Sequence, residues 1–228
     1  MAALISLSVA AALLFTGLVS LGLWQVHRLQ WKRALIHQVE MRIHDRLGPA
    51  PPQARPDDMY RRITARGRFL HDRTTLVQAS TVHGLGYWVL TPLLTDRGFI
   101  IIVNRGFVPP DRRSGYGKPT GTVRIVGLLR KTEPDGGFLR SNDPKADRWY
   151  SRDVSAISRA RNLRAPVANY FLDQEYSGAS TTLPIGGLTI VNFPNNHLTY
   201  AITWFALAAM VAGAYIVVMR HEWKACRA

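Results

Sequence analysis

A single histidine at the start of a long apolar segment is the residue of this sequence best placed to do chemistry. His197 is followed by Leu198–Met219, which contains no Lys, Arg, Asp or Glu and is long enough to cross a bilayer as a helix. An ionisable side chain at the first turn of such a helix predicts a binding site, because hydrocarbon penalises it unless something satisfies it. Tyr200 and Trp204 follow at offsets of three and seven, so we expect them on the same helix face.

A second candidate lies in the middle of the chain. The apolar run that ends at Val103 breaks into Asn104, Arg105 and Gly106 and then resumes. The planar guanidinium of Arg105 suits a carboxylate, so Arg105 and Asn104 are candidates for contact with an acidic partner or ligand. An equally open alternative is a β-bulge whose arginine pairs with a neighbouring aspartate.

The sequence contains none of the common enzyme signatures, such as a nucleophile elbow, a His-Glu-x-x-His helix, a phosphate loop or a dinucleotide fingerprint. Its seven histidines are scattered, and Cys226 is the only cysteine. A disulfide framework and a thiolate metal site are therefore excluded. We expect a protein that is not an enzyme and that has no metal ligand beyond His197.

Two membrane helices would position His197. The first apolar segment covers residues 1–26 and the second covers 197–219. Trp24 and Arg28 at the end of the first span could close the His197 site, although an aromatic belt with snorkelling cations explains the same pattern. Small residues on both spans would permit close helix packing. They are Gly17 and Ser20 on the first span, and Ala208 and Ala212 on the second.

The segment between the spans is β-rich. A helical extension and proline-rich linker (27–58), with helix to about residue 46, precedes the β-rich domain (59–196), and a basic tail follows the second span (220–228). Strands are predicted at 61–70, 74–79, 87–94, 99–108, 122–131, 167–174 and 188–193, with one short helix at 153–163. The fold class expected is a membrane protein with two transmembrane α-helices flanking a barrel- or sandwich-like α+β extracytoplasmic domain.

The formal net charge of +14 indicates acidic partners. Between two membrane spans, anionic lipid, an acidic protein surface or a carboxylate ligand explains the charge better than nucleic acid does. The basic tail favours cytoplasmic termini, whereas Arg28, Lys32 and Arg33 after the first span oppose that orientation.

Several blocks together resemble the Surfeit-locus-protein-one family of cytochrome c oxidase assembly factors, called Shy-type in yeast. The resemblance covers nearly the whole chain, in the family's order and with its two-span layout. Phe107 departs from the family, which often has Trp at that position. The blocks are Leu21-Gly22-Leu23-Trp24-Gln25 with Arg28 and Trp31-Lys32, Gly67-Arg68-Phe69, Tyr87-Trp88-Val89-Leu90-Thr91-Pro92-Leu93, Val103-Asn104-Arg105-Gly106-Phe107-Val108-Pro109, and the asparagine–histidine stretch before the second span.

The resemblance implies a factor that helps to build the haem a centre of oxidase subunit I, with haem a synthase as the donor of the cofactor. His197 matches the family's proposed haem contact. The central domain would be periplasmic and both termini cytoplasmic, and the lack of an amphipathic presequence favours the bacterial inner membrane. Haem a combines an iron, two propionates and an isoprenoid tail, which suit an imidazole, cations and hydrocarbon. A docking protein for oxidase subunits or haem a synthase, without its own cofactor, is the alternative.

Overall fold

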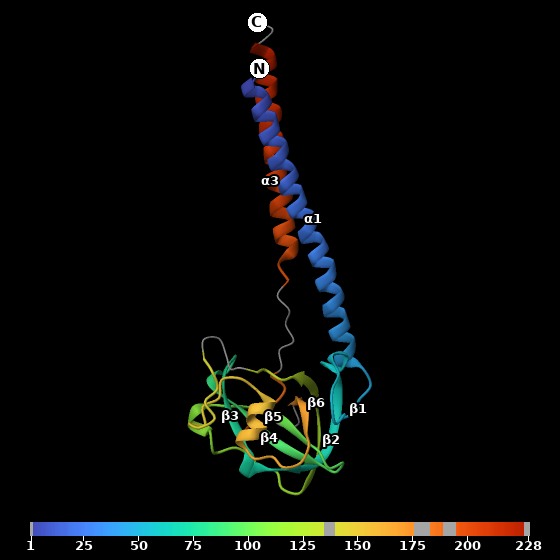
Figure 1. Cartoon of the computed structure of the whole chain (residues 1–228), viewed down its shortest axis with the longest axis vertical. Coiled ribbons are helices and arrows are strands. Elements are labelled where there is room, and N and C mark those ends of the chain that lie inside the picture. Colours follow the sequence, from blue (N-terminus) through green and yellow to red (C-terminus); the bar gives the residue numbers. More distant parts are fainter. Residues whose placement is uncertain (1, 135–139, 176–182, 189–194, 226–228) are drawn as a thin grey trace. The chain divides into compact units, whose positions relative to one another are not determined.

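The computed structural model describes residues 2–134, 140–175, 183–188 and 195–225, and these divide into two compact units. One unit comprises Met1–Gln38 with Asn192–Ala228, and the other comprises Val39–Val191. We call them the helical unit and the barrel unit and describe each by itself (Figure 1).

The helical unit is an antiparallel pair of helices, α1 (Ala2–His44) and α3 (His197–Ala225). The last residues of α1, from Val39 onward, belong to the barrel unit. Both helices are long and apolar enough to cross a membrane. The Ser8 and Tyr215 hydroxyls lie 2.9 Å apart, which joins the start of α1 to the late turns of α3. The start of α1 and the end of α3 accordingly lie at the same end of the pair in Figure 1.

Small residues bring the two helices together, but not all of those that the sequence predicts. Ala208 is buried as expected. Gly17 and Ser20 are exposed, and nothing lies near the point where a Cβ on Gly17 would stand, so the prediction for these two residues is wrong. Gly22 is the glycine of α1 that faces α3, where it packs against Phe205.

The barrel unit is built on one seven-stranded sheet, with strand order β1-β2-β6-β7-β5-β4-β3. A further pairing between β2 and β4 closes β2, β6, β7, β5 and β4 into a ring, so the predicted β-rich domain is a barrel and not a sandwich. The strands are β1 (Gly48–Pro49), β2 (Arg62–Phe69), β3 (Thr75–Thr81), β4 (Gly84–Thr95), β5 (Ile100–Val108), β6 (Thr122–Lys131) and β7 (Val167–Gln174).

Every residue of β5 is buried, because the two faces of this strand contribute to two different cores. Ile101 and Val103 belong to the larger core, which also holds side chains of β2, β6 and β7. Ile102 points to the other face and packs with Trp149 and Ile157 under the helix α2 (Val154–Ala160). This arrangement confirms that the continuous apolar run is covered on both faces.

Local signals in the sequence fix most of the connections. The predicted turn between β4 and β5 is present, with Gly98 at a φ of +82° and its N–H donating to the Thr95 carbonyl. The Asp153 side chain caps α2, as expected, by accepting from the Ala156 N–H. Leu188 lies outside any strand, and residues 189–193 of the last predicted strand fall outside the described part of the chain, as does the predicted turn at 135–137.

Three short 3₁₀ segments, η1 (Pro56–Asp58), η2 (His71–Arg73) and η3 (Pro110–Arg112), complete the barrel unit. The loop that follows η3 contacts His71 of η2 and Arg105 of β5 through its backbone carbonyl groups.

Candidate functional site

His197 is the first residue of α3 and is tied to α1 by a hydrogen bond. Its Nδ1 lies 2.8 Å from Oε1 of Gln25, which is itself buried between the helices. An amide oxygen accepts, so Nδ1 is the donor of this hydrogen bond and Nε2 is the ring nitrogen left for a ligand. A histidine that binds a metal is commonly oriented in this way by an acceptor on its other nitrogen.

The Nε2 atom of His197 is not fully buried. Among the described residues only Nδ1 has a partner, and Nε2 is not one of the buried atoms that lack one. Two residues earlier, Oδ1 of Asn195 is buried without a partner. The backbone carbonyl of Asn196 accepts from the Tyr200 N–H and so starts the helix.

The aromatic residues predicted to accompany His197 differ in their burial. Trp204 is half-buried, whereas Tyr200 is 55% exposed and Trp24 is 56% exposed. The Arg28 guanidinium lies over the Trp31 ring, 4.3 Å from its centroid, and not on Trp24. The structure therefore joins His197 to Gln25. Gln25 belongs to the Leu21-Gly22-Leu23-Trp24-Gln25 block of the sequence, but it was not among the predicted site residues.

In the barrel unit, Asn104 and Arg105 mark a β-bulge in β5. The register against β4 shifts between Trp88 and Leu90, and Gly106 has a φ of +126°. Consecutive side chains point to opposite faces, so the two candidates separate. Asn104 donates to Asp173 on β7 over 2.8 Å, whereas Arg105 points toward Phe69 and Tyr116.

The Arg105 side chain is a buried cation without an acidic partner among the described residues. It is 7% exposed, its Nη2 donates to the Gly117 carbonyl over 2.6 Å, and its Nη1 is buried without a partner. Burial lowers the pKa of Arg105, and the nearby Tyr116 opposes this effect. The bulge is confirmed, but the pairing of Arg105 with a neighbouring aspartate, offered as the alternative, is wrong for the described residues.

The segment Tyr116–Pro119 covers this arginine, and we call it the strap. Its Gly117 carbonyl accepts from Arg105, and its Pro119 carbonyl lies 2.8 Å from Nε2 of His71. Nδ1 of His71 is buried without a partner, like Nη1 of Arg105. Two side chains with unused buried nitrogen atoms therefore hold the strap in place.

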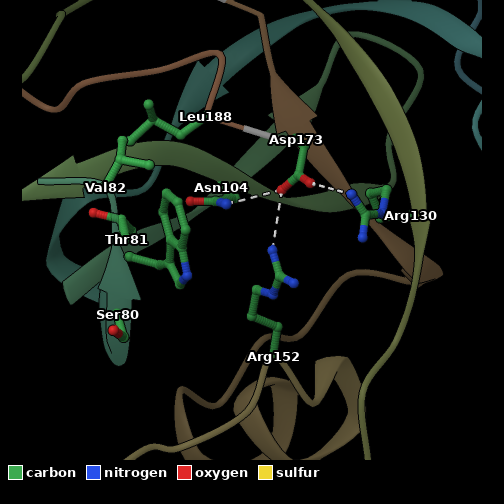
Figure 2. A pocket seen from close by; sticks show the side chains of 9 residues that line it. Ser80, Thr81, Val82, Asn104, Arg130, Arg152, Asp173 and Leu188 are labelled. Carbon is green, nitrogen blue, oxygen red and sulfur yellow. Dashed lines mark hydrogen bonds and ion pairs between the residues drawn. The ribbon is translucent and has the colours of Figure 1, made fainter. Parts of the chain in front are cut away.

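On the other face of the bulge, the buried carboxylate of Asp173 gathers several donors (Figure 2). Its side chain is 3% exposed. Oδ1 accepts from Asn104 and, at 3.5 Å, from Arg152, and Oδ2 accepts from Arg130 at 3.1 Å. Figure 2 shows the two arginines reaching Asp173 from different sides. We call these four residues the Asp173 cluster.

Glu133 holds Arg152 from outside this cluster. Nε and Nη2 of Arg152 donate to the two carboxylate oxygens of Glu133, at 2.9 and 2.5 Å. Burial acts to raise the pKa of Glu133, but the hydrogen bonds and the charge of Arg152 outweigh it, and the pKa lies below its ordinary value. The same contacts raise the pKa of Arg152 despite its burial.

The sequence analysis missed the Asp173 cluster because its members lie far apart along the chain. One signal was present, since Asp173 directly follows the apolar run Tyr170-Phe171-Leu172 of a predicted strand. Among the described residues, no group of three or more His, Cys, Asp or Glu side chains is arranged to hold a metal ion. The cluster is rich in donors and holds a single carboxylate, which suits binding of oxygen atoms and not of a cation.

Known proteins resemble this chain over most of its length. A model of the SURF1 family matches residues 12–209, which include every candidate site residue. A SURF1-like protein from Monosiga brevicollis is 33% identical over 220 residues, covering 88% of this chain and 82% of the relative. Surfeit locus protein 1 of Rattus norvegicus and of Homo sapiens are each 34% identical, covering 83% of this chain and 68% and 69% of the relatives. The chain therefore belongs to the SURF1 family.

Proposed function

We propose that this protein is a membrane-anchored assembly factor for cytochrome c oxidase that binds haem a and is not an enzyme. Membership of the SURF1 family supports the role in oxidase assembly, because the sequence resembles that family's assembly factors. In this proposal haem a synthase supplies the cofactor and oxidase subunit I receives it. The two apolar helices anchor the protein in a lipid bilayer.

The observation that carries the haem proposal is the hydrogen bond between His197 and Gln25. Haem a, when bound, supplies an iron that takes an imidazole nitrogen. Gln25 holds Nδ1 of His197, which leaves Nε2 as the ligand atom, so the residues present fit the group. The exposed aromatic surfaces of Trp24 and Tyr200, with the half-buried Trp204, offer apolar contact for a macrocycle.

Basic residues are assigned to the propionates in this proposal. The stacking of Arg28 on Trp31 occupies the face of the guanidinium and leaves its edge N–H groups for carboxylate oxygens. In the barrel unit, Arg105 and Asn104 stay candidates for contact with a partner or a propionate. The unpartnered Nη1 of Arg105 supports that role for Arg105, and the position of Asn104 beside a pocket supports it for Asn104.

We place the protein in the bacterial cytoplasmic membrane, with both termini in the cytoplasm and the barrel unit in the periplasm. The absence of charged residues from α3 up to Arg220 and the basic residues that follow support cytoplasmic termini. Fusion of a periplasm-active reporter at Gly84, the first residue of β4 after the β3–β4 turn, would be active in this orientation and inactive in the opposite one.

The test is the absorption spectrum of the full chain purified from cells that also express haem a synthase. Wild type is compared with His197→Ala and with His27→Ala, a control at an exposed histidine of α1. We expect a haem a Soret band in the wild type and the control, and its loss in His197→Ala at equal membrane abundance. Equal bands in all three would remove His197 as the ligand. The absence of a band in all three would leave a docking protein for oxidase subunits.

A further inference from the structure

A pocket of about 230 Å³ opens beside the Asp173 cluster in the barrel unit. One part of its wall is polar and consists of the Asp173 cluster with the hydroxyl groups of Ser80 and Thr81. The rest is apolar and includes Trp88, Val82 and Leu188. Figure 2 shows Asp173, Arg130 and Arg152 on one side of the pocket, and Val82 and Leu188 with Thr81 and Ser80 on the other.

The buried acid in this wall is already satisfied. Both oxygens of Asp173 accept hydrogen bonds, from Asn104, Arg130 and Arg152. The negative charge of a carboxylate that accepts from two guanidinium groups and an amide is already compensated, so no further cation is needed beside it. The acid therefore orients the two arginines.

Among the charged groups of the wall, the unused hydrogen-bonding capacity consists of donors. Among the described residues Arg130 donates to Asp173 alone, through one of its five N–H groups. Arg152 donates from Nη1 to Asp173 and from Nε and Nη2 to Glu133, which does not line the pocket. Arg130 therefore has fewer hydrogen bonds to carboxylate groups than Arg152, the other cation of the wall.

Aromatic rings fix both guanidinium planes. Arg152 lies over the Phe171 ring, 4.7 Å from its centroid, and Arg130 lies over the Tyr60 ring at 5.2 Å. Such stacking pre-organises a fork of donors, so that little conformational entropy is lost when a planar oxyanion binds.

We propose that this pocket binds a carboxylate carried by an apolar group, with Arg130 as its main contact. The volume is below that of pockets which enclose a drug-sized molecule, so it fits one terminal group. The apolar wall takes the hydrocarbon part, and Val82, which is 76% exposed, stands at the mouth. The carboxyl terminus of a polypeptide ending in an apolar residue and a small aliphatic acid share this chemistry. The inference does not depend on haem binding at His197.

The test uses the full chain in a non-ionic detergent and a fluorescein-labelled tetrapeptide that ends in a leucine carboxylate. Fluorescence anisotropy measures its binding, and the same peptide with a carboxyl-terminal amide is the chemical control. We expect the amide to bind at least about tenfold more weakly, because it lacks the charge-assisted hydrogen bonds. Equal binding of acid and amide, or no binding of either, would overturn the proposal.

Variants locate the contact. Arg130→Gln should weaken binding of the free acid at least about tenfold. Arg124→Gln, at an exposed arginine of the same strand, changes the net charge equally and should leave the affinity unchanged. Because Arg130→Gln also disturbs Asp173, Val82→Asp and Val82→Lys provide a second measurement at an exposed position. The aspartate should weaken binding and the lysine should not, whereas loss in both variants would refute an electrostatic contact.

Competition with unlabelled hexanoate distinguishes the two sources of the carboxylate. If hexanoate displaces the peptide at a concentration similar to the peptide's own Kd, the pocket recognises small acids. If hexanoate is more than about tenfold weaker, contacts along the chain contribute and the source is a polypeptide terminus.

Discussion

The Cε1 atom of Phe205 lies 2.6 Å from the point where a Cβ atom on Gly22 would stand, so the ring of α3 packs directly on the backbone of α1. Glycine at this position lets the backbones of the two helices approach each other closely. Farther along the same interface Ala201 and Ala208 are buried, and Gln25 reaches His197.

Gly22→Leu should separate the helices, because the new side chain and Phe205 cannot occupy the same space. The measurement is thiol cross-linking between Ser8→Cys and Tyr215→Cys, whose side chains touch in the wild type, after replacement of Cys226 by Ser. We expect the yield to fall several-fold.

Gly17→Leu is the control, because no atom lies within 4 Å of its Cβ position. Adding Phe205→Ala to Gly22→Leu should restore the yield in part. An unchanged yield in Gly22→Leu would show that Gly22 does not set the helix spacing.

Gln25→Leu should lower haem a occupancy without lowering the amount of protein in the membrane. The variant removes the acceptor that orients the imidazole of His197, while the buried volume is nearly kept. Loss of such a supporting hydrogen bond typically weakens metal binding about 10- to 100-fold. Gln25→Glu keeps the acceptor and should keep the haem. The Soret absorbance per mole of purified protein checks both variants, and equal values for the wild type and Gln25→Leu would speak against this role of Gln25.

Much of this fold is predictable from local patterns in the sequence. Alternation and β-branched residues predict the strands, Asp153 predicts the start of α2, and Gly98 predicts the hairpin turn. Each of these features is specified within a few residues, by the conformations that the chain can adopt there. The full burial of β5 is predictable for the same reason, because its apolar run is continuous.

The candidate sites depend on contacts that no local pattern encodes. Asn104 meets Asp173 because β5 and β7 pair in parallel, which brings residues 69 positions apart into one register. Gln25 meets His197 across 172 positions. Helical periodicity shows which residues of α1 share a face, but it does not tell which face meets α3, and this is why Gly22 and not Gly17 lies at the contact.

Arg105→Lys should destabilise the barrel unit and impair oxidase assembly, although the charge is kept. An ammonium group cannot lie flat against Phe69 and Tyr116 and donate to the Gly117 carbonyl at the same time. We expect a loss of about 1–2 kcal/mol in the free energy of unfolding, from the lost stacking and a weaker hydrogen bond. The checks are thermal unfolding of the purified chain and cytochrome c oxidase activity in membranes.

Arg113→Lys is the matched control for that variant, since Arg113 is exposed and stacks on Tyr87 at the surface. It should leave stability within about 0.5 kcal/mol of the wild type. If Arg105→Lys and Arg113→Lys change the free energy of unfolding and the oxidase activity equally, the burial of Arg105 does not contribute to either. If Arg105→Lys lowers stability while oxidase activity stays normal, Arg105 is structural and not a partner contact.

Glu133→Gln should destabilise the barrel unit at neutral pH and have less effect in acid. The contacts with Arg152 hold the pKa of Glu133 below its ordinary value of 4.5. A carboxyl group whose pKa is lower in the folded state contributes stability above the unfolded pKa and loses it as the pH falls through the folded pKa. The side chain is 41% exposed, so screening limits the contribution to about 1 kcal/mol, or about 3 °C in Tm.

Thermal unfolding of the wild type and Glu133→Gln at pH 7, 5, 4 and 3.5 checks whether the stabilisation by Glu133 is lost as the pH falls. The difference in Tm should be full at pH 7 and pH 5 and should shrink below about pH 4, as protonation of Glu133 makes the wild type resemble the variant. Glu40→Gln, at an exposed glutamate, should show no such convergence. A difference that grows in acid would mean that burial, and not Arg152, decides the ionisation of Glu133. Arg152 would then be oriented toward the pocket by Asp173 alone.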